Sequence, residues 1–291
     1  MHNLIAKADT FLEALPYIQR FRSATFVVKY GGSFMDSPVA EVRNGVARDI
    51  VFLEAVGINP VVIHGGGKAI TRAMEEAGLK AEFIQGQRVT NAETVEVVDR
   101  VLSQEINPEI VRTIESLGGK ARGFSGTTIF TCRKLWLTGQ GGEQIDIGLV
   151  GQVTGVNIEP LRECIRRGIT PVVSPTALGE DGKLYNCNAD VGAAQAAVFL
   201  KAKRLIFMSD VPGLLRDPRD PSTLISNLRA GEVPELKRLG IVDKGMIPKI
   251  DSAIAALEAG VDKVSLVDGR VPHAVILETF TDAGIGTEVI S

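Results

Sequence analysis

Apolar residues occur along this chain in two alternating patterns: short unbroken runs, and longer stretches in which they recur every three or four positions. An unbroken run of five or six residues indicates a buried strand, and the longer spacing indicates an amphipathic helix. The predicted strands of the core are residues 25–30, 60–64, 170–174, 203–208 and 263–267. The helical stretches between them predict βαβ units, and therefore an α/β protein, a three-layer αβα sandwich around a central, mainly parallel sheet.

The first helical stretch precedes the first core strand. Residues 3–21 have a helical spacing of apolar positions, and Pro16 within it predicts a kink or break near Leu15. Such a helix packs on its own domain or docks on a partner subunit, and the pattern alone leaves both open.

Three further segments carry specific predictions. Residues 123–155 are rich in glycine, threonine and short β-prone pieces, which predicts hairpins that form a flap over a site. The pair Asn107-Pro108 has the form of an N-cap followed by proline at the first helical position, so a new helix is expected to start there. Residues 214–228 contain two prolines and charges of both signs, and we expect a surface loop.

Composition excludes several classes of protein. Of 291 residues, 45% are hydrophobic and 23% charged, with a net charge of −3, so no basic excess indicates a nucleic-acid partner. Cys132, Cys164 and Cys187 show no C-x-x-C spacing, which disfavours a disulfide framework or a zinc site and fits a reducing cytosol. No apolar run reaches the roughly 18 residues of a membrane span. We therefore expect a cytoplasmic protein without a membrane partner.

Two predicted strands are followed directly by glycines, and we expect the functional site at these two junctions. Residues 61–68 read Val-Val-Ile-His-Gly-Gly-Gly-Lys, a buried strand, a turn without side chains and a helix start, which together suit an anion. A second junction joins Lys29 to Gly31-Gly32. The alternative is that such glycines only close tight turns. Because Ala69 follows Gly67-Lys68, a P-loop is excluded.

Two polar features depart from their surroundings. Arg88 stands among uncharged, β-prone neighbours, either as a surface residue of an edge strand or as a partner for an anion. Asn186, Asn188 and Asp190 precede an alanine-rich helix, and Asn188 or Asp190 is expected to cap it. The segment is nevertheless more polar than one cap requires.

Six motifs in order resemble the amino acid kinase family, and the resemblance runs from about residue 11 to the C-terminus. Any one motif is common, but the ordered set is specific. The motifs are Lys-Tyr-Gly-Gly (29–32), His-Gly-Gly-Gly (64–67), Gly-Gln-Arg-Val-Thr (86–90), Asn-Cys-Asn-Ala-Asp (186–190), Ser-Asp-Val-Pro-Gly (209–213) and Gly-Met-Ile-Pro-Lys (245–249).

The resemblance implies an ATP-dependent kinase that phosphorylates the γ-carboxylate of N-acetyl-L-glutamate in arginine biosynthesis. It further implies three regions: residues 1–22 as an oligomerisation helix, 23–180 as the lobe for the acyl amino acid and for dimerisation, and 181–291 as the lobe for ATP. The nucleotide would carry Mg²⁺, so no metal site of the protein itself is expected.

The resemblance also assigns roles to individual residues. Lys29 and Lys249 would neutralise the transferred phosphoryl group, and Asp190 would hold both ammonium groups in place. The phosphate would be bound by Gly31 and Gly32, and the acyl amino acid by Gly65, Gly66, Arg88 and Asn186. Residues expected to line the nucleotide pocket are Ser209, Asp210, Gly213, Leu214, Lys244 and Met246.

Features at the two ends resemble arginine-inhibited, hexameric members of the family. Tyr17, Glu278 and Gly284 would bind arginine as an effector, and the N-terminal helix would link dimers into a hexamer, a trimer of dimers. Whether a PII-type signalling protein also binds stays open, as does the choice between dimer and hexamer.

The sequence departs from the family pattern at two places, both in segments expected to face the acyl amino acid. Gln87 stands where leucine is common, and Ser125-Gly126-Thr127 lacks the usual Lys-Asp after Ser-Gly. A kinase for N-acetyl-aminoadipate, in lysine biosynthesis, is therefore an alternative. A non-catalytic arginine-sensing module of the same fold is another, although the presence of both lysines and Asp190 favours an active enzyme.

Overall fold

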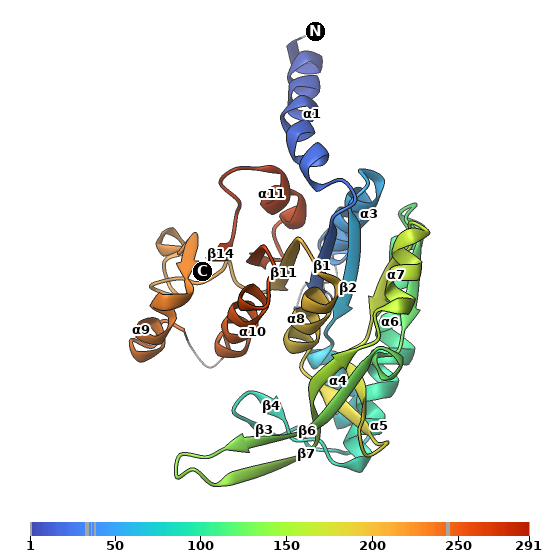
Figure 1. Ribbon diagram of the computed structural model, residues 1–291, viewed down its shortest axis with the longest axis vertical. Coiled ribbons are helices and arrows are strands. Elements are labelled where there is room, and N and C mark those ends of the chain that lie inside the picture. Colours follow the sequence, from blue (N-terminus) through green and yellow to red (C-terminus); the bar gives the residue numbers. More distant parts are fainter. Residues whose placement is uncertain (1, 33–34, 36, 38, 243–244, 291) are drawn as a thin grey trace.

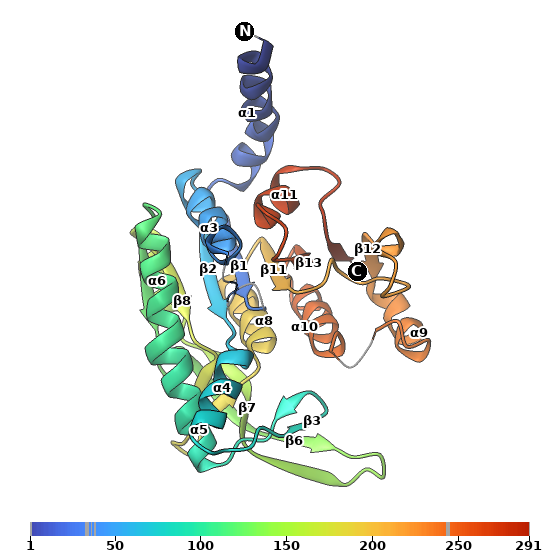
Figure 2. The ribbon, with the colours of Figure 1, turned by 180° about the vertical axis from the view of Figure 1, so that it is seen from behind.

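The computed structural model describes residues 2–32, 35, 37, 39–242 and 245–290. A central sheet lies between two layers of helices, and a long N-terminal helix projects from the body (Figures 1 and 2). Within the described residues, the sheet has the order β12-β14-β13-β11-β1-β2-β8-β5, and each of its pairs is parallel except β13–β14. The predicted mainly parallel sheet is thus confirmed.

The strands of this sheet are β1 (Thr25–Tyr30), β2 (Asn59–His64), β5 (Ala121–Phe124), β8 (Thr170–Val173), β11 (Arg204–Ser209), β12 (Asn227–Arg229), β13 (Lys263–Asp268) and β14 (Thr287–Ile290). The helices are α1 (His2–Phe21), α2 (Ala40–Arg43), α3 (Gly45–Ala55), α4 (Gly67–Glu76), α5 (Ala92–Asp99), α6 (Asn107–Ser116), α7 (Glu159–Arg166), α8 (Ala189–Leu200), α9 (Val233–Arg238), α10 (Ile247–Glu258) and α11 (Ala274–Phe280). None of the described helices has the length and apolar character needed to cross a membrane.

Alternation along β1 decides which side chains face which helices. Val28 packs with the layer of α3, α6 and α11, whereas Val27 packs with the layer of α8 and α10. Because successive side chains of a strand point to opposite faces, Lys29 shares the face of Val27. The strand therefore presents its one lysine toward α8 and α10.

The segment predicted to form hairpins does so. β6 (Phe130–Thr138) pairs with the long strand β7 (Gln144–Val156), and these strands close a small barrel with β9 (Thr176–Gly179) and β10 (Leu184–Cys187). Beside it lies the short hairpin of β3 (Phe83–Ile84) and β4 (Gln87–Arg88) (Figure 1). Gln85 donates a hydrogen bond of 2.8 Å to the carbonyl of Thr138, which joins the two hairpins.

Three predictions of local structure need correction. α1 continues through Pro16 without a break, so only the kink stays a prediction. Asn107 does not cap a new helix, because α5, a π-helix (η2, Arg100–Ile106) and α6 follow one another without interruption, and Asn107 is buried. The surface loop predicted over residues 214–228 is confirmed for residues 216–222, which are exposed, and is wrong at its ends, since Leu214 and Leu228 are buried in the core and β12 begins at Asn227.

Candidate active site

Two lysines and one aspartate from three elements meet near the carboxyl end of β1. Lys29 belongs to β1, Asp190 to the first turn of α8, and Lys249 to the first turn of α10. Lys249 donates a hydrogen bond of 2.6 Å to one carboxylate oxygen of Asp190. The Nζ of Lys29 lies 3.0 Å from the other oxygen, an ion pair without the angles of a hydrogen bond. The structure thus brings the three expected catalytic residues into contact.

The side chains of this charged cluster are nearly buried: they are 10% (Lys29), 7% (Asp190) and 17% (Lys249) exposed. Burial alone raises the pKa of Asp190, but the attraction of the two ammonium groups outweighs it and holds that pKa below its ordinary value. Burial lowers the pKa of Lys29; Asp190 opposes this shift and Lys249 adds to it. The carboxylate is therefore ionised and holds two ammonium groups that would otherwise repel.

Two glycine turns lie beside the charged cluster, at the ends of the paired strands β1 and β2. A Cβ at Gly31 would lie 3.0 Å from the Nζ of Lys29, and a Cβ at Gly65 would lie 3.7 Å from the Cα of Gly31. The N–H of Gly65 donates to the carbonyl of Tyr30 at 2.8 Å. Because this N–H is already hydrogen-bonded, Gly65 does not offer it to a ligand. The missing side chain of Gly65 instead lets the two turns approach each other closely.

Gly66 lies directly before α4 and has a different role. A Cβ at this position would lie 2.5 Å from a methyl carbon of Ile106 and 2.7 Å from one of Leu102, so a side chain here would displace the packed π-helix. The first N–H groups of a helix have no partner within the helix, and the helix dipole adds positive charge there. The start of α4 is thus suited to an anion.

Arg88 lies on β4 and is only 7% exposed, so the alternative of a surface residue was wrong. Its guanidinium donates hydrogen bonds of 3.0 Å to the carbonyl of Gly67 and to the hydroxyl of Thr71, and stands 4.7 Å from the ring centre of Phe83. Within the described residues it forms no ion pair. Burial lowers its pKa, yet a guanidinium remains charged at neutral pH.

One pocket of about 250 Å³ connects Arg88 with the charged cluster. Asn186 lines it and donates a 3.3 Å hydrogen bond to Thr90, whose own hydroxyl donates to the carbonyl of Arg88. Asn188 is the cap of α8, since its side chain accepts from the N–H groups of residues 190 and 191. The pocket contains these residues expected to bind or react: Lys29, Gly31, Gly32, Gly65, Gly66, Arg88, Asn186 and Asp190.

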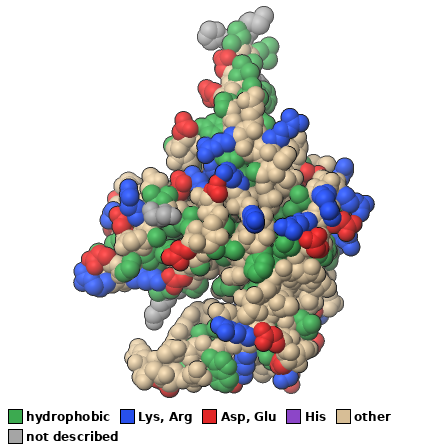
Figure 3. Space-filling view, viewed as in Figure 1, with side chains coloured by type: hydrophobic (Ala, Val, Ile, Leu, Met, Phe, Trp, Pro, Cys, Tyr) green, Lys and Arg blue, Asp and Glu red, His purple; other side chains and the backbone are tan. Residues whose placement is uncertain are grey.

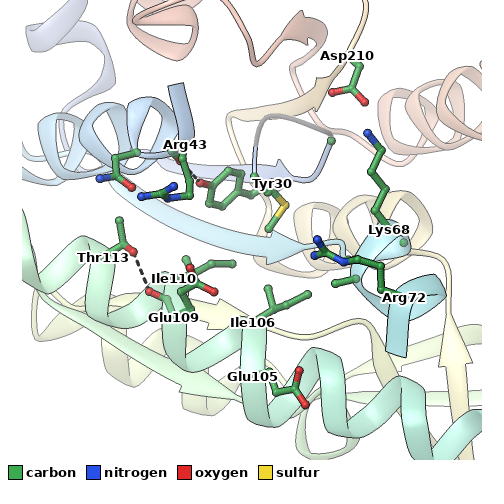
Figure 4. Close-up of a pocket in the computed structure, with 16 residues that line it drawn as sticks. Tyr30, Arg43, Lys68, Arg72, Glu105, Ile106, Glu109, Ile110, Thr113 and Asp210 are labelled. Atoms are coloured by element: carbon green, nitrogen blue, oxygen red, sulfur yellow. Dashed lines mark hydrogen bonds between the residues drawn. The ribbon is translucent and has the colours of Figure 1, made fainter. Parts of the chain in front are cut away.

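A second pocket of about 350 Å³ shares Gly32, Gly66 and Gly67 with the first and extends between α4, η2 and α6 (Figure 4). In the close-up the side chain of Lys68 points toward Asp210, at the carboxyl end of β11. Figure 3 shows the surface hollowed between the part formed by the two hairpins and the part formed by α9 and α10. The glycine turns therefore have open space on more than one side.

The residues expected at the nucleotide are dispersed. Asp210 lines the second pocket, and Ser209 is buried with its hydroxyl donating to Val211. The side chain of Leu214 lies in the core, and its N–H donates to the hydroxyl of Thr287. Gly213 packs against the same threonine, and Met246 directly precedes α10. Lys244 lies outside the described residues.

The three residues expected to bind arginine lie near one another, at the junction of α1 with α11 and the loop after it. The hydroxyl of Tyr17 donates to Asp282 at 2.5 Å. Glu278 is buried and accepts the N–H groups of Ile285 and Gly286. A Cβ at Gly284 would lie 2.7 Å from the Glu278 carboxylate.

Sequence analysis missed several residues of the first pocket. Phe83 faces Arg88 because the two are paired across β3 and β4, and the Gln85-Gly86 turn between them is the signal of a hairpin. Thr71, which lies outside the first pocket, supports it by accepting a hydrogen bond from Arg88, a contact that depends on the placement of α4. Among the described residues, no group of three or more metal-ligating side chains is assembled.

Known proteins resemble this chain over most of its length. The model of the Amino acid kinase family matches residues 24–268. An acetylglutamate kinase of Akkermansia muciniphila is 50% identical over 289 residues, 99% of this chain and 96% of that protein. One of Heliobacterium modesticaldum is 45% identical over the full length of both.

A solved N-acetylglutamate synthase of Neisseria gonorrhoeae shares the fold. Complexed with coenzyme A and N-acetyl-glutamate, it superposes with a TM-score of 0.83 at 26% identity, over 98% of this chain. Complexed with coenzyme A and L-arginine, it superposes with a TM-score of 0.78. This chain spans 63% of the first of these synthase chains. Sequence and structure therefore agree that the chain belongs to the amino acid kinase family.

Proposed function

We propose that this kinase transfers the γ-phosphoryl group of ATP to the γ-carboxylate of N-acetyl-L-glutamate, yielding N-acetyl-L-glutamyl 5-phosphate for arginine biosynthesis. One observation carries the proposal: a single pocket is lined both by Arg88, which forms no ion pair within the described residues, and by Lys29 and Asp190, with Lys249 bonded to Asp190 from behind. A substrate with two carboxylates fits it, one bound and one reacting. The names of the full-length relatives support this choice of substrate.

The reaction follows from the charges. An oxygen of the substrate γ-carboxylate forms a bond to the γ-phosphorus, while the bond from that phosphorus to the β–γ bridging oxygen breaks and its electron pair leaves with ADP. No side chain forms a covalent bond. Lys29 and Lys249 stabilise the negative charge of the transferred group, and Arg88 pairs with the α-carboxylate. ATP enters with Mg²⁺ as part of the substrate.

The decisive experiment is ADP release measured side by side with N-acetyl-L-glutamate, N-acetyl-aminoadipate, glutamate and aspartate. The largest kcat/KM is expected with N-acetyl-L-glutamate. A larger value with N-acetyl-aminoadipate would assign the protein to lysine biosynthesis instead. Release of ADP with none of the four would contradict the proposal and favour an arginine-sensing module.

We further propose that arginine inhibits the enzyme and that α1 joins dimers into a hexamer. α1 projects from the body (Figure 2). It exposes apolar side chains, among them Phe11 at 75% and Leu12 at 64% exposure. Its hydrogen bond from Tyr17 to Asp282 couples this helix to the loop beside Glu278. The complex of the related synthase with L-arginine supports the choice of effector.

Size-exclusion chromatography with and without residues 1–20 tests the hexamer. A hexamer that becomes a dimer on deletion is expected, together with weaker arginine inhibition. A dimer both before and after deletion would contradict the role given to α1.

A further inference from the structure

The histidine that precedes the glycine turn has no part in the chemistry described so far, yet it is fully buried. His64 ends β2, and its side chain lies on the face of the sheet covered by α6. Its Nδ1 lies 3.0 Å from the carbonyl oxygen of Gly65, and its Nε2 lies 3.2 Å from the side-chain nitrogen of Asn107. A single imidazole thus bridges the turn and the helix behind it.

The hydrogen-bond partners of this imidazole determine its tautomer and its protonation state. The carbonyl of Gly65 only accepts, so Nδ1 carries the hydrogen. The Asn107 side-chain nitrogen donates to the carbonyl of Val172 at 3.0 Å, which orients the amide so that its second hydrogen faces Nε2. Nε2 must therefore accept, and the ring is neutral. Burial supports this by lowering the pKa of His64 to about 4.

The π-helix explains why an asparagine can reach this histidine. Leu102 and Ile106 of η2 press on Gly66, and Asn107 follows at once. The i→i+5 hydrogen bond of a π-helix widens the turn, so Leu102 and Asn107 lie closer to a common face than in an α-helix, where residues five apart differ by roughly 140°. Gly123 leaves room for the amide, since a Cβ there would lie 2.1 Å from the Asn107 oxygen.

We propose that His64 and Asn107 are positioning residues for phosphoryl transfer, because together they hold the Gly65 carbonyl and thereby aim the N–H of Gly66 into the active-site pocket. In a planar trans peptide the N–H points opposite to the preceding carbonyl. The Gly65 carbonyl turns toward α6, so the N–H of Gly66 turns toward the face that carries Lys29. Gly66 lines the first pocket, whereas neither His64 nor Asn107 does.

This inference rests on the proposed function, which places a phosphoryl group beside Gly66. A carbonyl that rotates would carry the Gly66 donor away from that group, and small displacements of such donors lower rates by one to two orders of magnitude. The binding of ATP itself would change little, since its other contacts remain.

The test uses four variants of the full chain assayed for ADP release. His64→Leu removes the bond to the carbonyl, and we expect kcat to fall about 10–100-fold with little change in the KM for ATP. His64→Asn returns an amide donor at the position of Nδ1 and is expected to recover a large part of kcat. Asn107→Leu removes the hydrogen bond to Nε2, and its kcat is expected to lie between those of His64→Leu and His64→Asn. Ser116→Ala, an exposed change on the same helix, is the matched control.

Nitrogen-15 NMR of the wild-type imidazole provides a readout that does not depend on activity. The hydrogen is expected on Nδ1 above pH 5, and Asn107→Leu is expected to weaken this preference. Hydrogen on Nε2 in the wild type, equal kcat for His64→Leu and His64→Asn, or wild-type kcat in a folded His64→Leu would each overturn the inference. If His64→Leu does not fold, Asn107→Leu and the NMR measurement decide. A wild type that phosphorylates no substrate would overturn the proposed function alone.

Discussion

The two ends of the active-site pocket treat buried charge in opposite ways. At one end Asp190 lies against two lysines, and their attraction keeps its pKa below the ordinary value. At the other end, the partners of Arg88 among the described residues are neutral: a carbonyl, a hydroxyl, a thioether sulfur and an aromatic face. Burial lowers the pKa of Arg88. At the lysine end Asp190 balances one of the two lysine charges before any ligand binds, whereas the charge of Arg88 is left for an anionic ligand.

From this difference we infer that the lysine end serves catalysis and the arginine end serves substrate binding. Because Asp190 holds Lys29 and Lys249 in place, the two ammonium groups are positioned before the substrate arrives. They can therefore stabilise the transition state without rearrangement. An uncompensated guanidinium gains its carboxylate only when the substrate binds, so its energy contributes to affinity and selection. We therefore expect changes at the lysine end to lower kcat and changes at the arginine end to raise KM.

The largest effect is expected for Lys249→Ala. Loss of one ammonium group from the transferred phosphoryl group should lower kcat about 10²–10³-fold, as measured by ADP release at saturating substrates. Lys237→Ala, which breaks an exposed ion pair with Asp251, is the matched control and should leave kcat unchanged. Full activity of Lys249→Ala would contradict the two-lysine mechanism.

Arg88→Lys should raise KM more than it lowers kcat. A lysine cannot form the two parallel hydrogen bonds of a guanidinium with a carboxylate, so the KM for the acyl amino acid should rise about 10–100-fold, with a smaller change in kcat. Arg166→Lys on the exposed side of α7 controls for the loss of a surface guanidinium. A fall in kcat equal to the rise in KM would show that the two ends do not act separately.

Gly66→Ala probes the turn between the two ends. The added methyl would meet Ile106 and Leu102 at 2.5–2.7 Å, so the free energy of unfolding should fall by about 1–3 kcal/mol. Because this turn serves both ends, kcat and the KM for the acyl amino acid should both worsen. Gly67→Ala, where a Cβ meets nothing within 4 Å, is the control for urea unfolding.

The last effect is one of pH, and it changes stability alone at the pH of the activity assay. The pKa of His64 is about 4 in the folded protein and about 6.5 in an unfolded chain, so the unfolded state binds the extra proton first. The free energy of unfolding should therefore fall as the pH is lowered from about 6.5 to about 4, by at most about 1.4 kcal/mol per pH unit. Urea unfolding across this range should show a shallower dependence for His64→Asn. Equal slopes would contradict a neutral buried histidine.

The sequence predicted the framework well where local pattern and burial agree. Strand β1 has the predicted bounds, because a run such as Phe26-Val27-Val28 is buried on both faces. The resemblance to the family assigned Lys29, Asp190 and Lys249 together, and the structure brings them into contact. Parallel strands with ends at one edge make such an assembly general in α/β proteins.

The failures have tertiary causes. Asn107-Pro108 has the local signature of a helix start, but Asn107 is bonded to His64 and Val172 inside a continuous helix, which no local pattern reveals. Leu214 sits in a segment with two prolines, yet the core buries it. The pairing of Phe83 with Arg88 required knowledge of a two-residue hairpin register.

The position of β1 between β2 and β11 has a consequence for folding order. On one side β1 pairs with a strand about 35 residues away, and on the other Phe26 pairs with Arg204. Contacts that distant along the chain form slowly, because loop closure precedes any gain from them. A chain still emerging from the ribosome can build the glycine turns long before it contains Lys249. Phosphoryl transfer is therefore among the last properties that the folding chain acquires, and its recovery after denaturation reports completion of the whole sheet.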